Sequence, residues 1–185
     1  MNFCSQCGST ITFRVPQGDS LPRHICQSCG EIHYLNPKLV IGCIAEWEGK
    51  ILLCRRAIDP RYGFWTLPAG FMENGESTAQ AALRETYEEA CARVEIDSLF
   101  SLVNLPDINQ VHLFYRARLL NGNFSSGIES LETMLFSEEN IPWNELAFRS
   151  VELCLNAYIT DRRKGIFMFH EDVLMTSQAN DSHQD

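Results

Sequence analysis

Arg84, Glu85, Glu88 and Glu89 bring one basic and three acidic side chains into six consecutive residues. Carboxylate oxygens are ligands that Mg²⁺ prefers, and a metal held in this way can shield phosphate charge and activate water. A run of charged residues is also typical of a helix face that is merely solvated. The residue types alone leave both interpretations open.

The segment that contains these residues has helical periodicity from Glu76 to about Ala90. Ala79, Leu83 and Thr86 recur with Ala90 at intervals of three and four residues, and we expect this stripe to face the core. At about 100° per residue, the three glutamates gather on a different face. Like charges three and four residues apart destabilise a helix, so they need either water or a compensating cation.

Four of the eight cysteines form two CxxC pairs, Cys4 with Cys7 and Cys26 with Cys29. A glycine follows each pair and allows a tight turn that brings two thiolates to one side. Two such pairs complete the four tetrahedral ligands of structural zinc, which stabilises segments that have little core. A redox dithiol needs only one pair, and disulfides suit a secreted chain, so we expect a zinc ribbon over residues 1–36.

Most of the elements around the charged helix are predicted strands. Residues 39–47 and 51–54 flank a turn and predict a hairpin. A loop rich in proline, glycine and aromatic residues then leads to the helix. Further elements are expected as strands at 94–96, 99–105, 110–120 and 131–136, and as a helix from an N-cap at Ser150 to about Lys164, before Gly165. This mixture indicates an α/β sandwich over residues 37–175, with a polar, disordered tail at 176–185.

The spacing around the charged helix favours the metal interpretation. Gly70, five residues, Glu76, seven residues and Arg84-Glu85-Thr86-Tyr87-Glu88-Glu89 resemble the Nudix box, Gly-x5-Glu-x7-Arg-Glu-x-x-Glu-Glu. The four-cysteine ribbon, the approach Trp-Thr-Leu-Pro-Ala-Gly at 65–70 and Glu129-Ser130-Leu131-Glu132 also resemble zinc-ribbon Nudix enzymes that act on ADP-ribose or FAD. The resemblance implies a Nudix α/β/α sandwich with an N-terminal four-cysteine zinc ribbon.

The same resemblance implies roles for the charged residues. Glu85, Glu88 and Glu89, with the carbonyl group of Ala69, would bind catalytic Mg²⁺ or Mn²⁺. Arg84 would orient carboxylates such as that of Glu76. The general base lies either on the box helix or in the later loop. In that loop Glu129 and Glu132 are the candidates, and a solvated loop charge is the alternative for each.

Residues before and after the box loop are candidates for substrate binding. Arg55 and Arg56 follow a predicted strand, where each could pair with phosphate or form ordinary surface charge. Phe64, Trp65 and Phe71 could stack on a substrate ring, although aromatic residues near a strand often belong to the core.

The implied reaction is hydrolysis of the diphosphate bond of a nucleoside diphosphate derivative. ADP-ribose, giving AMP and ribose 5-phosphate, and FAD, giving AMP and FMN, are the leading substrates. NADH or another dinucleotide is an alternative, although the Ser-Gln-Pro-Trp-Pro-Phe-Pro-x-Ser stretch of ribbon-bearing NADH pyrophosphatases is absent. A non-catalytic ligand sensor is a further alternative, but it has no need of three mutually repelling carboxylates.

The end of the box departs from the family pattern. Thr86 stands where a bulky aliphatic residue is usual, and it keeps a β-branched shape. Cys91 and Ala92 stand where the family usually has glycine and an aliphatic residue. Glycine past a helix end provides a left-handed cap at no steric cost, so we expect the helix to end differently at Cys91.

Whole-chain composition bounds the partners. A formal net charge of −9 argues against broad binding to nucleic acid, which depends on Lys and Arg. No apolar run approaches the roughly 20 residues that span a bilayer, and we see no secretory signal at the start. We therefore expect a cytoplasmic homodimer that binds a small nucleotide and neither nucleic acid nor a membrane, with the ribbon as a structural or dimer-forming accessory.

Overall fold

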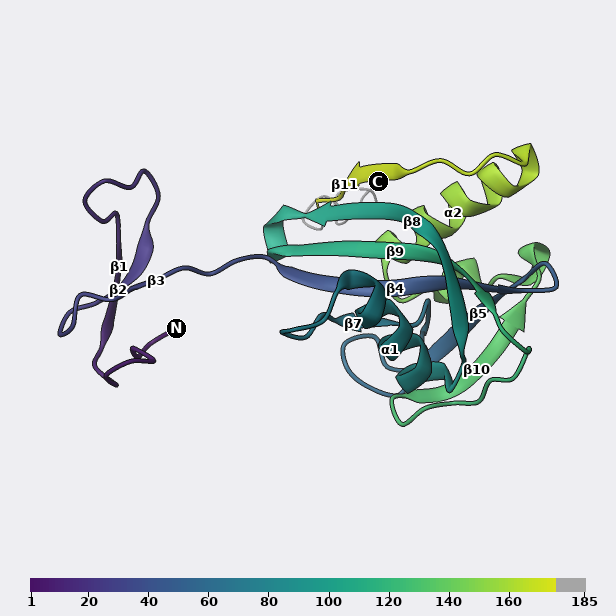
Figure 1. Ribbon diagram of the computed structural model, residues 1–185, viewed down its shortest axis with the longest axis horizontal. Coiled ribbons are helices and arrows are strands. Elements are labelled where there is room, and N and C mark those ends of the chain that lie inside the picture. The colour runs from purple at the N-terminus through teal and green to yellow at the C-terminus, as the bar shows by residue number, and fades with distance from the viewer. Residues whose placement is uncertain (176–185) are drawn as a thin grey trace, which may run out of the picture. The chain divides into compact units, whose positions relative to one another are not determined.

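The computed structural model describes residues 1–175, and the predicted tail at 176–185 lies outside them. Contacts within the chain separate two compact units, Met1–Pro37 and a unit that begins at Lys38 (Figure 1). Each unit has its own sheet. No helix among the described residues is long and apolar enough to cross a membrane.

The first unit is a three-stranded antiparallel sheet in the order β1-β2-β3. Its strands are β1 (Ile11–Arg14), β2 (Arg23–Cys26) and β3 (Ile32–His33). Its buried apolar residues are Cys4, Pro16, Ile25 and Cys26. So small a core supplies little hydrophobic stabilisation, and a unit of this size needs another source of stability.

The second unit is a mixed sheet of eight strands. Six of them run in the order β10-β5-β4-β9-β8-β11, with β6 beside β5 and β7 beside β4. The strands are β4 (Lys38–Trp47), β5 (Lys50–Arg56), β6 (Trp65–Thr66), β7 (Ala69–Phe71), β8 (Val94–Leu105), β9 (Gln110–Leu119), β10 (Ser130–Phe136) and β11 (His170–Val173). β4 pairs in parallel with β9, and β8 with β11, while the other pairs are antiparallel.

The helices α1 (Thr78–Ala90) and α2 (Arg149–Lys164) cover opposite faces of this sheet (Figure 1). Alternate residues of a strand point to opposite faces. Ile41 and Cys43 of β4 accordingly pack in one cluster with Ala81 and Ala82 of α1, whereas Ile44 packs in the other with residues of α2. The predicted α/β sandwich is therefore confirmed.

Helix α1 begins after a reciprocal cap, and its buried face shares Thr86 and Ala90 with the predicted stripe. The Ser77 hydroxyl accepts from the Gln80 N–H at 3.3 Å, and the Gln80 side chain accepts from the Ser77 N–H at 2.8 Å. The predicted core stripe is wrong at Leu83, which is 40% exposed. The buried residues of α1 are instead Ala81, Ala82, Glu85, Thr86, Glu89 and Ala90. Two of the three box glutamates thus lie on the face that packs against the sheet.

The other predicted elements differ in how well they match the structure. The hairpin at 39–54 is confirmed by β4 and β5. The strands predicted at 94–96 and 99–105 are one strand, β8, whose register shifts interrupt the pattern. The predicted N-cap at Ser150 is wrong, because α2 begins at Arg149 and the Ser150 hydroxyl bonds to His112. Gly165 does cap α2 in the left-handed conformation, with φ 69°.

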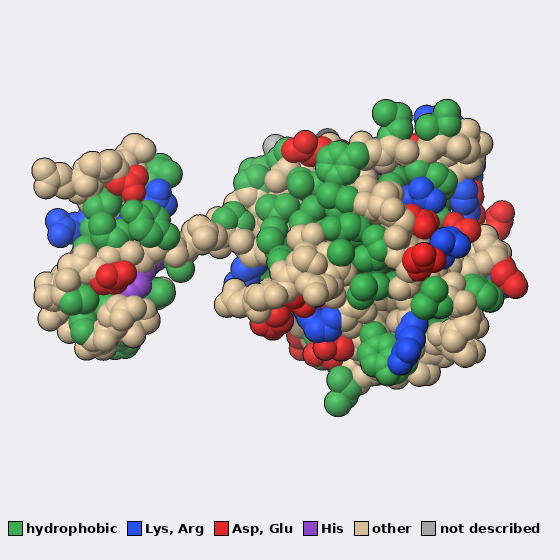
Figure 2. Space-filling view, viewed as in Figure 1, with side chains coloured by type: hydrophobic (Ala, Val, Ile, Leu, Met, Phe, Trp, Pro, Cys, Tyr) green, Lys and Arg blue, Asp and Glu red, His purple; other side chains and the backbone are tan. Residues whose placement is uncertain are grey.

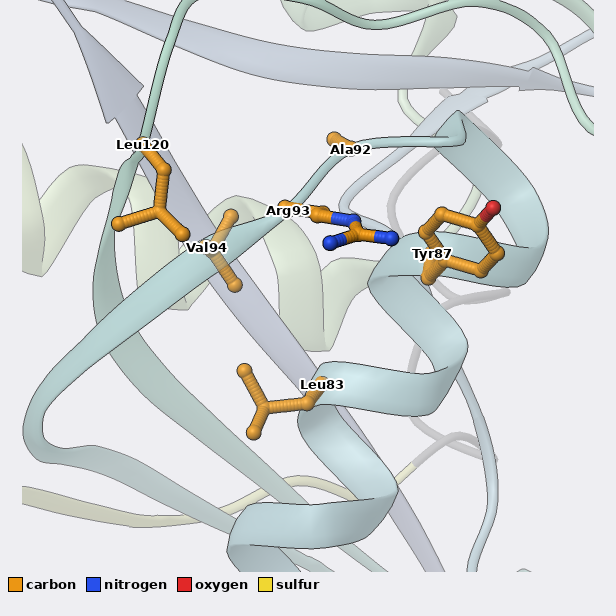
Figure 3. A pocket seen from close by; sticks show the side chains of 6 residues that line it. All are labelled: Leu83, Tyr87, Ala92, Arg93, Val94 and Leu120. Atoms are coloured by element: carbon orange, nitrogen blue, oxygen red, sulfur yellow. The ribbon is translucent and has the colours of Figure 1, made fainter.

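Some large apolar side chains of the second unit stay exposed, and Figure 2 shows hydrophobic side chains gathered on one face of it. A shallow depression of about 340 Å³ lies beside the C-terminal half of α1 (Figure 3). Its lining residues are Leu83, Tyr87, Ala92, Arg93, Val94 and Leu120. None of them is a carboxylate, so this depression is separate from the acidic residues of the box.

Candidate active site and zinc site

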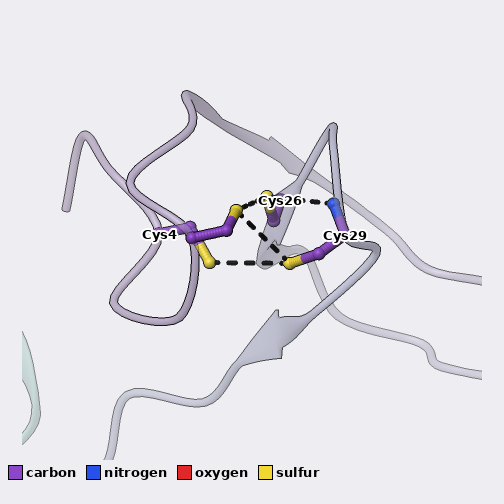
Figure 4. Close-up of side chains that lie close together, drawn as sticks. Cys4, Cys26 and Cys29 are labelled. Carbon is purple, nitrogen blue, oxygen red and sulfur yellow. Dashed lines mark hydrogen bonds between the residues drawn. The ribbon is translucent and has the colours of Figure 1, made fainter.

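The four paired cysteines of the first unit converge. Their Sγ atoms all lie within 4.8 Å of one another, and three of the pairs are 3.4, 3.6 and 3.8 Å apart (Figure 4). Tetrahedral ligands about 2.3 Å from zinc would be about 3.8 Å from each other, so the set fits a zinc ion. Among residues 1–175 it is the one group of three or more Cys, His, Asp or Glu ligands that meets this closely.

Backbone groups also hold the sulfur atoms in place. The Gln6 N–H donates to Cys4 Sγ at 3.4 Å, and the Cys29 N–H donates to Cys26 Sγ at 3.5 Å. His33 Nε2 lies 3.3 Å from Cys4 Sγ. Such contacts orient the ligands of a metal from outside its coordination sphere.

In the second unit, Arg84 is the centre of an acidic network. Its Nη1 donates to Glu85 Oε1 at 2.6 Å and to Glu88 Oε2 at 2.9 Å. Its Nε and Nη2 donate to the two oxygens of Glu76 at 3.1 and 2.6 Å, and Nη2 also donates to the Phe71 carbonyl at 3.1 Å. Arg84 therefore fixes three carboxylates relative to the loop before α1.

The box glutamates differ in exposure. Glu85 and Glu89 are 9% and 6% exposed, whereas the Glu88 side chain is 55% exposed. Glu89 Oε2 accepts from the Ala69 N–H at 3.1 Å. Burial raises the pKa of Glu89 to about 8 and also raises the pKa of Glu85, although the bonds from Arg84 oppose the latter shift. The two buried carboxylates thus favour the charged form less than free carboxylates do.

Gly70 allows strand β7 to approach helix α1 closely at Glu85. A Cβ atom built on Gly70 would lie 2.3 Å from a carboxylate oxygen of Glu85. Any other residue would have to displace that carboxylate. Glycine at the start of the box is therefore required by the contact between the loop backbone and the helix.

The charges around these groups fit a divalent cation. Besides burial, the charge of Glu129 raises the pKa of both Glu85 and Glu89, while Arg56 lowers that of Glu89. With Glu76 and Glu88 the cluster has five carboxylates, balanced by the two guanidinium groups of Arg84 and Arg56. Oxygen ligands with excess negative charge suit Mg²⁺ or Mn²⁺.

The remaining polar candidates occupy two environments. Arg55 Nη1 lies 3.8 Å from Glu132 Oε2 across the β5–β10 pair, and Arg55 Nε donates to the Gly63 carbonyl at 2.8 Å. Arg56 is buried, and its guanidinium group lies 5.1 Å from the centre of the Phe148 ring. Glu129 and Arg56 thus act on the buried glutamates through their charges, while Arg55 and Glu132 are paired with each other.

A cavity of about 480 Å³ opens on the face of the sheet that α2 covers. Arg56, Ala69 and Phe71 line it together with apolar side chains, including Val40, Leu105, Ile108, Phe114 and Leu174. Phe71 is 49% exposed, so part of its ring is accessible to a ligand, and Lys38 Nζ lies 4.9 Å from its ring centre. Trp65 is only 6% exposed and packs edge-on against Phe136, which makes it a core residue and corrects the expectation that it stacks on a substrate.

Strand β7 connects the acidic cluster with the cavity. Its Ala69 and Phe71 line the cavity, while Gly70 between them faces the Glu85 carboxylate. The alternation of side chains along a strand places the two features on opposite sides of one short strand. A ligand in the cavity can therefore extend a charged group past the edge of β7 toward the glutamates.

Three residues that line the cavity were not predicted as site residues from the sequence: Gln110, His112 and Ser150. Ser150 was expected to be a helix cap, and His112 was not singled out in the predicted strand. The available signal was the alternation of Gln110, His112 and Phe114 along one face of β9, but it did not show that this face is open to a cavity.

These features together describe a unit with an acidic helix and a ligand-sized cavity on the two sides of β7, and a separate unit with a four-cysteine metal site. The chain belongs to the Nudix family, since the family model described as NUDIX domain matches residues 36–149. The model described as Nudix N-terminal, a zinc ribbon, matches residues 2–35. The resemblance and the fold expected from it are thereby confirmed.

Relatives of known structure or curated name agree with this assignment. The crystal structure of a NUDIX hydrolase from Nitrosomonas europaea is 54% identical, with a TM-score of 0.92, over 95% of this chain and 100% of that one. An ADP-ribose pyrophosphatase from Methanocaldococcus jannaschii is 31% identical over 62% of this chain and 69% of that enzyme. A NAD-capped RNA hydrolase NudC from Chromobacterium violaceum is 32% identical over 50% of this chain, which spans only 33% of that enzyme's length.

Proposed function

We propose that this chain hydrolyses the diphosphate bond of a nucleoside diphosphate derivative with Mg²⁺ or Mn²⁺, and that ADP-ribose is its first substrate. The observation that supports this most directly is the placement of Glu85 and Glu89. Both are buried carboxylates that lie against β7, and the Ala69 and Phe71 side chains of that strand line the cavity.

Each residue of the cluster has a distinct part in this mechanism. Glu85, Glu88 and Glu89, with the Ala69 carbonyl, would hold the cation, which when bound shields phosphate charge and lowers the pKa of water. Arg84 keeps Glu85 and Glu88 oriented through its bonds to them and to Glu76. Arg56 positions the phosphates by charge, and either Glu129 or a box glutamate accepts the proton of the attacking water.

The choice of ADP-ribose is supported by the curated names of relatives. Two of them, from Methanocaldococcus jannaschii and Bacillus subtilis, are named as an ADP-ribose pyrophosphatase and a putative one. NAD-type dinucleotides are a second candidate, because several NudC relatives match at 27–32% identity. FAD stays a prediction from the sequence, as do the cytoplasmic location and the homodimer.

A substrate panel tests this proposal. Purified protein is incubated with Mg²⁺ or Mn²⁺ and ADP-ribose, FAD, NADH or a diadenosine polyphosphate, and the release of monophosphates is followed by chromatography. We expect AMP and ribose 5-phosphate from ADP-ribose. Absence of turnover with every compound would contradict an enzymatic role, and tight binding without turnover would favour a ligand sensor.

The variant Glu89→Gln tests the metal site. Loss of a metal ligand should cost at least the ~10–100-fold that loss of an outer-shell partner costs. We expect turnover to fall by about 100-fold or more while zinc content and fold are retained. Glu139→Gln, an exposed glutamate of the second unit, is the matched control and should keep the wild-type rate. An equal rate in the Glu89 variant would mean that the metal site is misassigned.

A further inference from the structure

His112 is a buried histidine whose two ring nitrogens both have partners. Nδ1 lies 2.9 Å from Ser150 Oγ, and Nε2 lies 2.9 Å from Gln110 Oε1. The three residues come from β9 and α2, and all of them line the 480 Å³ cavity. They form a polar chain in a largely apolar wall.

The chemistry of the partners fixes the direction of the hydrogen bonds. An amide oxygen only accepts, so His112 Nε2–H donates to Gln110 and Nδ1 accepts from the Ser150 hydroxyl. Burial lowers the pKa of His112 to about 4, so the ring is neutral near pH 7 and keeps this arrangement. The Gln110 oxygen is thereby occupied, and among residues 1–175 its amide nitrogen has no hydrogen-bond partner.

The strand register places this amide beside an apolar slot. His112 is directly opposite Val40, and Val40 is directly opposite Phe71. Gln110 is directly opposite Leu105, and Ile108 and Leu174 complete the lining nearby. Lys38 is opposite Gln110 on β4, and its Nζ lies 4.9 Å from the Phe71 ring centre at the edge of this slot. An apolar slot with a neutral donor inside this edge suits an uncharged heteroaromatic ring that carries an acceptor atom.

Other parts of the cavity wall differ from the apolar slot because they carry charged side chains. The basic lining residues are Arg56, Arg61 and Arg149. Guanidinium groups pair with phosphate and do not select between uncharged rings. The arginines therefore suit the diphosphate, which leaves the slot beside Gln110 for the nucleobase.

We propose that Gln110, held by the His112–Ser150 pair, donates a hydrogen bond to a ring nitrogen of the purine base and so determines base specificity. Gln110 contacts the substrate, and His112 and Ser150 are positioning residues. This inference rests on the proposed function, because it names the base-bearing end of a nucleoside diphosphate substrate.

The variant Gln110→Glu separates recognition from folding. The carboxylate still accepts from His112 Nε2–H but has no N–H to donate. Loss of a neutral hydrogen bond corresponds to about 3–10-fold, so we expect KM for ADP-ribose to rise by at least that factor while kcat changes less. Gln27→Glu, an exposed glutamine of the ribbon, is the matched control and should leave KM unchanged.

Substrate analogues identify the acceptor atom. ADP-ribose in which one purine ring nitrogen at a time is replaced by carbon is compared in the wild type and Gln110→Glu. One analogue should raise the wild-type KM by about 3–10-fold and should be poorly distinguished from ADP-ribose by the variant. If the variant loses affinity for every analogue by the same factor as the wild type does, Gln110 does not contact the base.

Ser150→Ala tests the positioning role. It should raise KM and weaken the discrimination between the analogues, whereas a purely structural role would lower only the melting temperature.

Binding of AMP, measured by calorimetry, provides a readout that does not depend on turnover. We expect 3–10-fold weaker binding to Gln110→Glu than to the wild type or Gln27→Glu, as about one neutral hydrogen bond requires. Turnover by the wild type with equal AMP affinity in both proteins would overturn the inference and leave the proposed function intact. If the wild type shows no turnover but the variant binds AMP more weakly, the proposed function fails and the inference stands. If the wild type does not bind AMP, the inference fails.

Discussion

At Gly70 the chain leaves no room for a side chain, because a Cβ atom there would lie 2.3 Å from the Glu85 carboxylate. That carboxylate is also bound to Arg84 at 2.6 Å. A displacement of Glu85 therefore changes the position of a proposed metal ligand without changing its chemistry.

We accordingly expect Gly70→Ala to lower turnover by about 100-fold, the effect that a displacement of about 1 Å can have on a catalytic group. Circular dichroism and zinc content should match the wild type, which separates this effect from unfolding. Addition of more Mg²⁺ should restore part of the rate if the loss lies in metal affinity. A wild-type rate would mean that Glu85 can move without consequence for catalysis.

The lowered pKa of His112 should make the free energy of unfolding depend on pH. Its pKa is lowered by burial to about 4 from 6.5, and its hydrogen-bond partners, Ser150 and Gln110, are uncharged. Between those two values the unfolded chain binds the proton more readily than the folded chain does. The free energy of unfolding should therefore decrease as the pH falls from about 6.5 toward about 4, with no contribution from His112 at higher pH.

Urea denaturation at about pH 7.5 and about pH 5 measures this effect. The wild type should lose more stability between the two conditions than His112→Phe does, because the variant lacks the titrating group. Equal losses would show that His112 is protonated as easily in the folded chain as in the unfolded chain.

At this scale the sequence predicts the residues of the acidic cluster better than their environment. The spacing from Gly70 to Glu89 indicates which carboxylates belong together, because it reflects local helix geometry. It does not reveal that Glu85 and Glu89 are buried while Glu88 is exposed, since that depends on where β7 packs. The role of Gln110 was missed for a similar reason, because the cavity involves residues from six strands, from α2 and from the loops between them.

At the scale of elements, the end of α1 is strained. Cys91 caps the helix with φ 47° and ψ 23°, and its N–H bonds to the Tyr87 carbonyl at 2.8 Å. A residue other than glycine pays about 1–2 kcal/mol in this left-handed conformation. The expectation that the helix ends differently at Cys91 is therefore wrong, because the backbone takes the conformation that glycine favours and only the residue type differs.

Cys91→Gly should therefore stabilise the protein by about 0.5–1 kcal/mol, after allowance for the greater freedom of glycine in the unfolded chain. Cys91 is exposed, so little packing is lost. Cys91→Ala is the control, because it removes the thiol but keeps the strain, and it should give no such gain. Urea denaturation of the three proteins measures the difference, and equal stability of the two variants would contradict strain as the cause.

Elements with strong local patterns were predicted well, and elements that depend on distant partners were not. The hairpin of β4 and β5 has apolar strands around a short turn, which is local information. β11 has the polar residues His170, Glu171 and Asp172, and it forms by parallel pairing with β8, about 70 residues earlier in the chain. Leu83 was misplaced because the buried face of α1 includes Glu85 and Glu89, and apolar periodicity alone does not show that carboxylates face the sheet.

At the scale of the whole molecule, the chain has two proposed metal sites of different chemistry in two separate units. Four sulfur ligands fill a tetrahedral zinc sphere and hold a small sheet with few buried residues. The glutamates of α1 provide oxygen ligands and leave room for water and phosphate. We therefore expect each site to bind its metal without the other.

The double variant Cys4→Ser with Cys26→Ser tests this independence. It should lose its zinc and the fold of residues 1–37, because such a small unit depends on metal for stability. Hydrolysis of ADP-ribose should stay within about threefold of the wild type, since every residue assigned to that reaction lies in the second unit. Glu89→Gln should show the opposite pattern, with zinc retained and turnover lost. Elemental analysis and kinetics on the same samples measure the zinc content and the turnover rate. If the cysteine variant loses turnover although the circular dichroism spectrum of the second unit is intact, the ribbon contributes to catalysis.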